Sequence, residues 1–441
     1  MKKRYRLTGA QLILLGFASM ILIGALLLML PWASQERKWT PFIDALFTAT
    51  SAGCVTGLVV HDTATYWSVF GKIVLFALIQ IGGLGIITMT IIFFRLAGKK
   101  IGLAHRSTMQ EAVSAPQIGG IVQMTRRIVL MTLLFETLGA VCLMPAFIRD
   151  FGVARGITYS IFHSVSAFCN AGFDLMGHRE AFSSFTSYAA DPLVNLTLIA
   201  LILIGGMGFL TWDDVRNHGF RLRRYTTQSK VILATAVILI FLPALYFFLA
   251  DYKDLPLGER TLRSLFQSVT TRTAGFNTSD QASLSGVGFL LTIILMLIGG
   301  APGSTAGGMK MTTIAIVVLA MFAVFGRKRD TAVFRRRLNK ETIRIAYSIF
   351  LMYILMFLLG GCLLCLIEGL PLEKTLYESA SAVGTVGLTT GITPGLGTAS
   401  KIILAVMMFT GRVGGLTMIF AAVSTKDNGN MKYPEDRITV G

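Results

Sequence analysis

Long apolar stretches recur along this chain and constrain its fold more than any other feature. They lie at about 8–31, 67–94, 128–148, 193–212, 231–250, 286–325, 343–367 and 401–424. Each approaches or exceeds the roughly 20 residues that a helix needs to cross a bilayer. Only 14% of the residues are charged, against about 25% in a soluble domain. The sequence therefore predicts an all-α membrane protein with eight transmembrane spans, and residues 7–31 are too long for a cleaved signal peptide.

The basic residues show which side of the membrane each link occupies. Of the 40 Lys and Arg residues, 26 lie in the two termini or in the links after the second, fourth and sixth spans. Such a bias marks the cytoplasmic side. We therefore expect a multi-pass protein of the cell membrane, in contact with lipid, with both termini cytoplasmic. The net charge of +17 reflects this topology, and no nucleic-acid partner is expected.

The other four links each end in a short segment, and these four segments resemble one another. They read DALFTATSAGCVTGL (44–58), SIFHSVSAFCNAGF (160–173), RSLFQSVTTRTAGF (263–276) and KTLYESASAVGTVGL (374–388). In three copies an aromatic residue stands ten positions before a shared glycine, and the third copy is one residue shorter. Each segment is too short to span the membrane as a helix. We expect a pore helix that enters the membrane and returns as a loop.

A glycine cluster follows each of these segments inside the next span. The clusters read QIGGLG (80–85), LIGGMG (203–208), LIGGAPG (297–303) and FTGRVGG (409–415). For Gly82, Gly83, Gly205 and Gly206 we expect a packing role, because small residues let membrane helices approach closely. The repeating unit is thus span, pore helix, loop and span. Four parallel units surround a central ion pathway: residues 1–94, 95–212, 213–325 with a broken second span, and 326–441 with a short cytoplasmic tail.

A non-helical loop at membrane depth is tolerated only where protein buries it or where it lines a watery cavity. Four such loops around one axis would present rings of backbone carbonyls, which can replace the hydration shell of a monovalent cation such as potassium. Glycine suits such a loop because it adopts positive φ without steric cost. The expected selectivity filter consists of four tetrads: Cys54, Val55, Thr56 and Gly57; Cys169, Asn170, Ala171 and Gly172; Arg272, Thr273, Ala274 and Gly275; Gly384, Thr385, Val386 and Gly387.

The third unit departs from the repeat in mid-membrane. Proline and glycine disfavour helix, so this stretch predicts a loop that acts as a gate, the alternative being a kinked helix without a role. Its residues are Gly299, Gly300, Ala301, Pro302, Gly303, Ser304, Thr305, Ala306, Gly307 and Gly308.

The fourth unit has an arginine, Arg412, within its glycine cluster. A charge at this depth usually faces a cavity or a partner. It is either an electrostatic barrier in the pore or a structural tie to backbone carbonyls.

The fourfold plan, with TSAGCVTGL, FCNAGF, TTRTAGF and GTVGLTTG, resembles the Trk/Ktr/HKT superfamily of potassium transporters over essentially the whole chain, most closely the KtrB-type membrane subunits. The resemblance implies potassium uptake, sometimes sodium-dependent, by a homodimer that rests on a cytoplasmic ring of nucleotide-binding KtrA-type subunits. It also matches the gate stretch to an intramembrane loop and favours the barrier role of Arg412.

Two other functions remain open on the residues alone. A secondary transporter of a small solute would bind its substrate at broken helices near the midplane, but that class usually has two repeats rather than four. An intramembrane enzyme would need a nucleophile or metal cluster, and the sequence shows neither pattern. No nucleotide-binding motif is present, so nucleotide sensing would belong to a partner, and we expect no cofactor in this chain.

Overall fold

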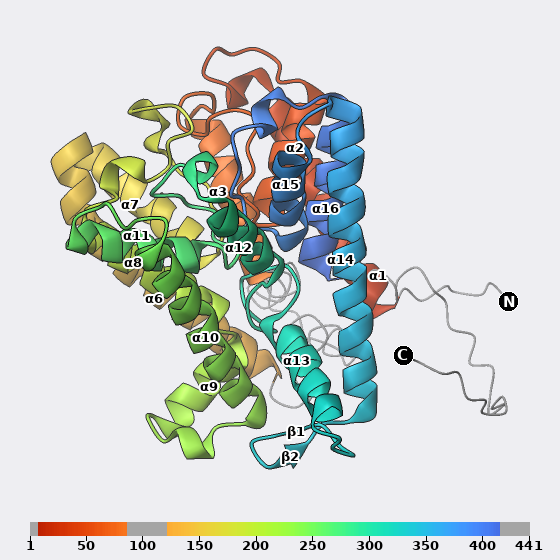
Figure 1. Cartoon of the computed structure of the whole chain (residues 1–441). Coiled ribbons are helices and arrows are strands. Elements are labelled where there is room, and N and C mark those ends of the chain that lie inside the picture. The colour runs from red at the N-terminus through yellow and green to blue at the C-terminus, as the bar shows by residue number, and fades with distance from the viewer. Residues whose placement is uncertain (1–7, 86–120, 415–441) are drawn as a thin grey trace, which may run out of the picture.

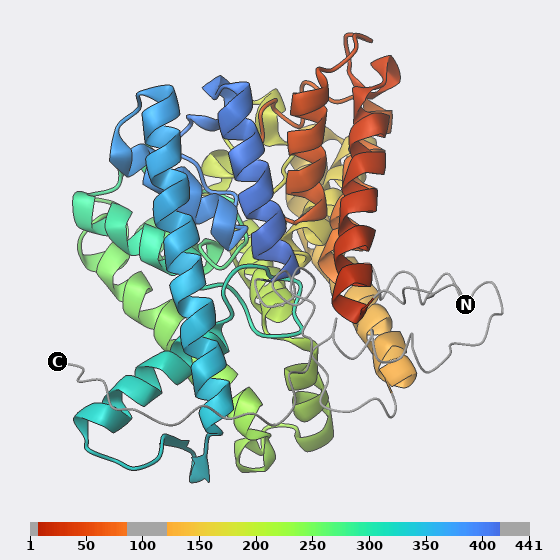
Figure 2. The ribbon, with the colours of Figure 1, turned by 90° about the vertical axis from the view of Figure 1, so that its right-hand side faces the viewer.

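The computed structural model describes residues 8–85 and 121–414, and this part of the chain is almost entirely helical (Figure 1). Four helices are long and apolar enough to cross a membrane. They are α1 (Gly9–Met29), α6 (Ile121–Phe151), α10 (Thr227–Leu249) and α14 (Lys340–Glu368). Each is the first span of one repeat. In Figure 2 the long α14 runs nearly the full height of the molecule.

Each long helix is followed by a shorter helix that matches a predicted pore segment. These pore helices are α2 (Phe42–Gly53), α7 (Val153–Phe168), α11 (Leu257–Thr270) and α15 (Leu372–Gly384). Proline precedes the first residue of three of them, at Pro41, Pro256 and Pro371. Their C-terminal halves are buried. All four end where a filter tetrad begins, so the negative ends of their dipoles face the tetrads.

Four shorter apolar helices form the described beginnings of the second spans. They are α3 (Val69–Leu84), α8 (Pro192–Gly206), α12 (Gly286–Leu297) and α16 (Thr398–Val413). Three of them stop at or just before a glycine in the same conformation: Gly85, Gly208 and Gly414 have φ of 85°, 89° and 88°. An L-amino acid rarely adopts such an angle. The glycine clusters therefore end these helices as well as packing them.

The predicted span 193–212 is not one continuous helix. After α8 the chain turns by 99° into α9 (Phe209–His218), because Gly208 breaks the helix. The sixth span is broken as predicted, since α12 and α13 (Met311–Phe325) are separated by a non-helical segment. The ends of the second and eighth predicted spans, 86–94 and 415–424, lie outside the described residues. By length and composition the described part has four membrane-crossing helices, or five with the bent pair.

The four units pack against one another in a closed cycle. The second span of each unit contacts the pore helix of the next: α3 with α7, α8 with α11, α12 with α15, and α16 with α2. The main buried core surrounds the pore helices. Apolar side chains such as Val237, Ile238 and Phe241 of α10 are exposed on the outside, as expected for a surface in contact with lipid.

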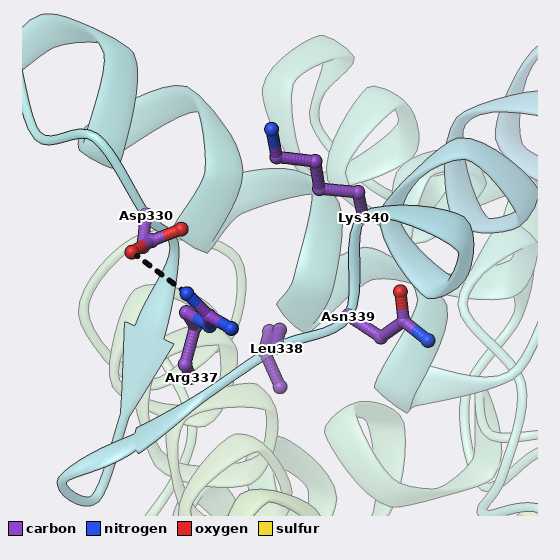
Figure 3. A pocket seen from close by; sticks show the side chains of 5 residues that line it. All are labelled: Asp330, Arg337, Leu338, Asn339 and Lys340. Carbon is purple, nitrogen blue, oxygen red and sulfur yellow. Dashed lines mark hydrogen bonds and ion pairs between the residues drawn. The ribbon is translucent and has the colours of Figure 1, made fainter.

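A small hairpin lies at the foot of the molecule in Figure 1, at the end opposite the pore helices α2 and α15. Its strands are β1 (Ala332–Val333) and β2 (Arg336–Arg337). Beside the hairpin is an open pocket at the start of α14, where Arg337 Nη1 lies 3.5 Å from Asp330 Oδ2 (Figure 3). Short 3₁₀ turns complete the described chain at Pro31–Ala33, Met176–His178, Thr186–Tyr188, Leu222–Arg224, Gln281–Ser283 and Thr393–Gly395.

Candidate ion pathway

The four filter tetrads share one backbone conformation. The second residue of each tetrad has a positive φ: 53° at Val55, 56° at Asn170, 58° at Thr273 and 51° at Thr385. The fourth residue of each tetrad is always glycine, and its φ is also positive, between 68° and 97°. Non-glycine residues adopt such angles rarely and at some cost in energy. Four matched occurrences therefore indicate a conformation that the surrounding structure imposes.

The four glycines close a ring. A Cβ built on Gly57 would lie 3.0 Å from the Cα of Gly172, and one on Gly172 would lie 3.1 Å from the Cα of Gly275. Likewise, a Cβ on Gly275 would lie 3.1 Å from the Cα of Gly387, and one on Gly387 would lie 3.0 Å from the Cα of Gly57. Each glycine is thus in close contact with the next unit, and a side chain at any of them would collide with its neighbour.

Backbone oxygens lie beside this ring. The carbonyls of the third tetrad residues are each 2.2–2.7 Å from the position that a Cβ on a neighbouring glycine would occupy. Within the described residues no hydrogen-bond donor reaches these oxygens. They belong to Thr56, Ala171, Ala274 and Val386. Four unpaired carbonyls around one narrow point are suited to coordinating a cation.

A hydroxyl from each pore helix holds its tetrad in place. Ser51 and Ser381 accept hydrogen bonds from the amides of Gly57 and Gly387, at 3.0 Å and 2.9 Å. In the other two units the hydroxyl donates instead, from Ser166 to the Phe173 carbonyl and from Thr270 to the Phe276 carbonyl. The serines stand six residues before their glycine and Thr270 stands five before Gly275, so the shorter third copy still keeps this contact.

The side chain of Arg272 points away from the ring. Its guanidinium donates to the carbonyl of Ala236 on α10 at 2.8 Å. The Arg272 carbonyl accepts from Asn170 Nδ2 at 3.0 Å and is therefore already engaged. The thiols of Cys54 and Cys169 are free and buried.

The segment from Gly299 to Gly308 is non-helical and is bonded to three units. Within its own unit, Gly299 donates to the carbonyl of Met309 at 2.8 Å. Ala301 donates to the carbonyl of Gly206 in the second unit at 2.9 Å, and Gly308 donates to that of Gly411 in the fourth at 3.1 Å.

The same loop also touches the tetrads. The Thr305 hydroxyl lies 3.0 Å from Oδ1 of Asn170 and 2.9 Å from the carbonyl of Phe168. A Cβ on Gly307 would lie 2.1 Å from the hydroxyl of Thr385. The loop therefore packs directly against two of the four tetrads.

Arg412 occupies the position that Gly83, Gly206 and Gly300 hold in the other clusters. Its guanidinium donates to the carbonyls of Thr305 in the loop and Gly82 at the end of α3, and to that of Gly83 at 3.1 Å. The tie to backbone carbonyls is therefore present, and it joins three units. The barrier role stays a prediction. Lys310 Nζ bonds the carbonyl of Ala306 at 2.7 Å, which places a second cationic group on the loop.

The packing role predicted for the second-span glycines is confirmed for Gly82, Gly83 and Gly205. A Cβ on Gly82 would lie 2.2 Å from the carbonyl of Gly53, at the end of α2. One on Gly83 would lie 2.5 Å from Sγ of Cys169, and one on Gly205 would lie 2.0 Å from the carbonyl of Phe168. Gly206 is less crowded, with its nearest neighbour at 3.8 Å. These second spans thus press against the ends of the pore helices and fix where the tetrads begin.

Sequence reasoning expected a polar structural partner for His163 but did not single out Glu378 and Gln267, which are also polar side chains on the pore helices behind the ring. Glu378 on α15 is fully buried, and its Oε1 accepts a hydrogen bond from Thr393 at 2.7 Å. His163 and Gln267 are likewise buried. Their shared position in the repeat could have identified them, because each stands eight or nine residues before the ring glycine of its unit.

Comparison with known proteins decides the family. The TrkH family model, described as a cation transport protein, matches residues 8–432. The chain belongs to the TrkH family of cation transport proteins. It is therefore an integral membrane ion transporter and not an enzyme.

Individual relatives cover nearly the full length. The chain is 38% identical to the potassium/sodium uptake protein NtpJ of Enterococcus hirae, over 100% of this chain and 99% of that protein. It is 38% identical to the Ktr system potassium uptake protein B of Bacillus subtilis, over 100% and 98%. The crystal structure of the potassium transporter TrkH from Vibrio parahaemolyticus superimposes with a TM-score of 0.73, covering 96% of this chain and 86% of that one at 20% identity. This last likeness supports the fold.

Proposed function

We propose that this chain takes up potassium across the cell membrane through the ring formed at Gly57, Gly172, Gly275 and Gly387. The observation that carries the proposal is the ring itself: four glycines in mutual contact, with four carbonyls beside them that no described donor engages. Such oxygens replace the water shell of a monovalent ion. The full-length relatives named for potassium or sodium uptake support the same substrate.

The loop from Gly299 to Gly308 acts as the gate in this proposal. It contacts two tetrads through Thr305 and Gly307 and is held by Arg412. Release of these contacts would let the loop move without unfolding a helix. Arg412, a cation beside the path, would slow conduction when the loop is closed.

The chain faces the cytoplasm with both termini and with the basic links, and it works as a homodimer on a nucleotide-binding ring. The β1–β2 hairpin lies in the basic link after the sixth span. It supports docking of a partner at these links, since Arg336 and Arg337 of the hairpin are exposed. An acidic partner surface would complement these charges. Co-purification from the native membrane tests this, and the absence of any cytoplasmic protein in the purified complex would contradict it.

Flux in proteoliposomes tests the transport function. Purified protein should carry rubidium or potassium down its concentration gradient. Measuring this uptake with and without sodium will show whether sodium competes for the pathway or is required for transport. Vesicles that accumulate a sugar or an amino acid but no rubidium would instead favour a secondary transporter. A Gly387→Ser variant serves as the matched control, because its side chain would fill the ring.

A further inference from the structure

One position on every pore helix is both polar and buried. It is Thr48, His163 or Glu378, nine residues before the ring glycine, and Gln267 in the shorter third copy, eight residues before it. These side chains are at most 1% exposed. A buried polar group is costly unless it is hydrogen-bonded, so each should have a definite partner.

In three units the partner lies in the chain that leaves the filter. Nε2 of His163 accepts from the amide of Leu175 at 2.9 Å, three residues after Gly172. Gln267 exchanges two hydrogen bonds with Gln281, at 2.8 Å and 3.1 Å. These contacts connect the pore helix to the segment on the far side of its own tetrad.

Glu378 makes the corresponding contact in the fourth unit. Its Oε1 accepts from the hydroxyls of Thr389 and Thr393, two and six residues after Gly387. Thr389 in turn accepts from the amide of Gly391 at 2.9 Å. Oε2 has no partner among the described residues. One carboxylate oxygen thus organises the turn that follows the filter.

The first unit provides the contrast. The Thr48 hydroxyl donates to the carbonyl of Asp44 in its own helix at 2.8 Å, and the structure gives it no bond to the segment after Gly57. The position is polar in all four units, but only three of them use it across the filter.

We propose that Glu378, together with His163 and Gln267, is a positioning residue that holds the outgoing chain against its pore helix and so sets the spacing of the ring carbonyls. In this proposal, selectivity between potassium and sodium depends on that spacing. Glu378 acts as a hydrogen-bond acceptor through Oε1, and its charge is not required. This inference rests on the proposed filter function.

The test compares Glu378→Ala with Glu378→Gln in proteoliposomes that carry rubidium. The readout is the ratio of the sodium and potassium concentrations that halve rubidium uptake, measured on protein that elutes as a single folded species. Glu378→Ala should lower this ratio by about fivefold for each of the two hydrogen bonds lost. Glu378→Gln retains the acceptor oxygen and should keep the ratio near that of the unmodified protein, even if the protein melts earlier because its new amide lacks a partner.

Thr48→Val is the matched control and should leave the ratio unchanged. Thr393→Val should lower the ratio in the unmodified protein and have no further effect in Glu378→Ala, because both changes remove the same bond. If Glu378→Ala does not fold, Thr389→Val combined with Thr393→Val removes the same two donors.

Three results would overturn the inference: an unchanged ratio in a folded Glu378→Ala protein, an equal fall in Glu378→Gln, or an equal fall in Thr48→Val. The second would mean that the charge matters, and the third that any change in the buried layer matters. A lack of rubidium uptake by the unmodified protein would instead contradict the proposed function, so the two failures are distinguishable.

Discussion

Alanine substitutions in the glycine ring should differ in severity, and the structure gives their order. A Cβ at Gly387 would lie 2.2 Å from the carbonyl oxygen of Thr56, whereas one at Gly172 would lie 2.7 Å from that of Ala274. Real Cβ atoms essentially never lie closer than 3.0 Å to such an atom. To reach that limit, the neighbouring carbonyl must retreat by about 0.8 Å in Gly387→Ala but by only about 0.3 Å in Gly172→Ala.

Backbone strain acts in the same direction. Gly172 has a φ of 68°, close to the left-handed helical region near 57°, whereas Gly387 has a φ of 97°. Alanine costs about 1–2 kcal/mol in the first conformation and more in the second. A carbonyl displaced by about 0.8 Å no longer fits the ion, so we expect potassium flux to fall about 100-fold in Gly387→Ala and about 10-fold in Gly172→Ala.

The assay is rubidium uptake into proteoliposomes, divided by the amount of folded protein. Gly391→Ala is the control, because Gly391 has a φ of 88° but no atom within 4 Å of its Cβ position. It shares the backbone strain without the clash, and its flux should fall far less than that of Gly387→Ala. Equal losses in the two ring variants, or a larger loss in Gly172→Ala, would refute this account of the ring.

Three further predictions concern Arg412, the loop from Gly299 to Gly308 and the carboxyl group of Asp174. Arg412→Gln should raise rubidium flux per folded protein several-fold if the arginine is a barrier, and a fall at equal folding would leave only its structural tie. Thr305→Val removes a hydroxyl donor that lies 2.9 Å from the Phe168 carbonyl and 3.0 Å from Asn170 Oδ1, and it should raise basal flux. Ser304→Ala, whose hydroxyl donates to the Ala301 carbonyl within the loop, should not. Burial raises the pKa of Asp174, just after the second tetrad, to about 7. The folded protein therefore retains a proton that the unfolded chain loses near pH 4, so the melting temperature should fall as the pH rises from 4 to 7. Asp174→Asn should remove most of that fall, and an identical pH profile would contradict it.

The sequence predicted the fourfold plan because its signals are local and repeated. Four pore segments with one glycine in common indicated the loops, and the positive φ at Gly57 and its counterparts explains why glycine stands there. The proline and glycines after α12 indicated the break in that span in the same way. Such features depend on the chain within a few residues of each other.

Long-range contacts could not be predicted in this way. The bend after α8 was missed because LIGGMG is apolar throughout and hydropathy does not register a change of direction. The three carbonyls bound by Arg412 belong to residues 107 to 330 positions away in sequence. Glu378 was overlooked because its partners, Thr389 and Thr393, are ordinary loop residues whose role appears only once the chain folds back.

The covalent joining of the four units has a consequence for how such a pathway can open. Arg412 stands where the other three clusters have glycine, and its guanidinium bonds both the loop and the end of α3. Four identical chains around an axis could not accommodate this arrangement, because four guanidinium groups would converge and four loops would compete for one space. A fused chain carries a single copy of each. If the loop is the gate that we propose, a single rearrangement on one side of the axis opens it, and no concerted change of four subunits is required.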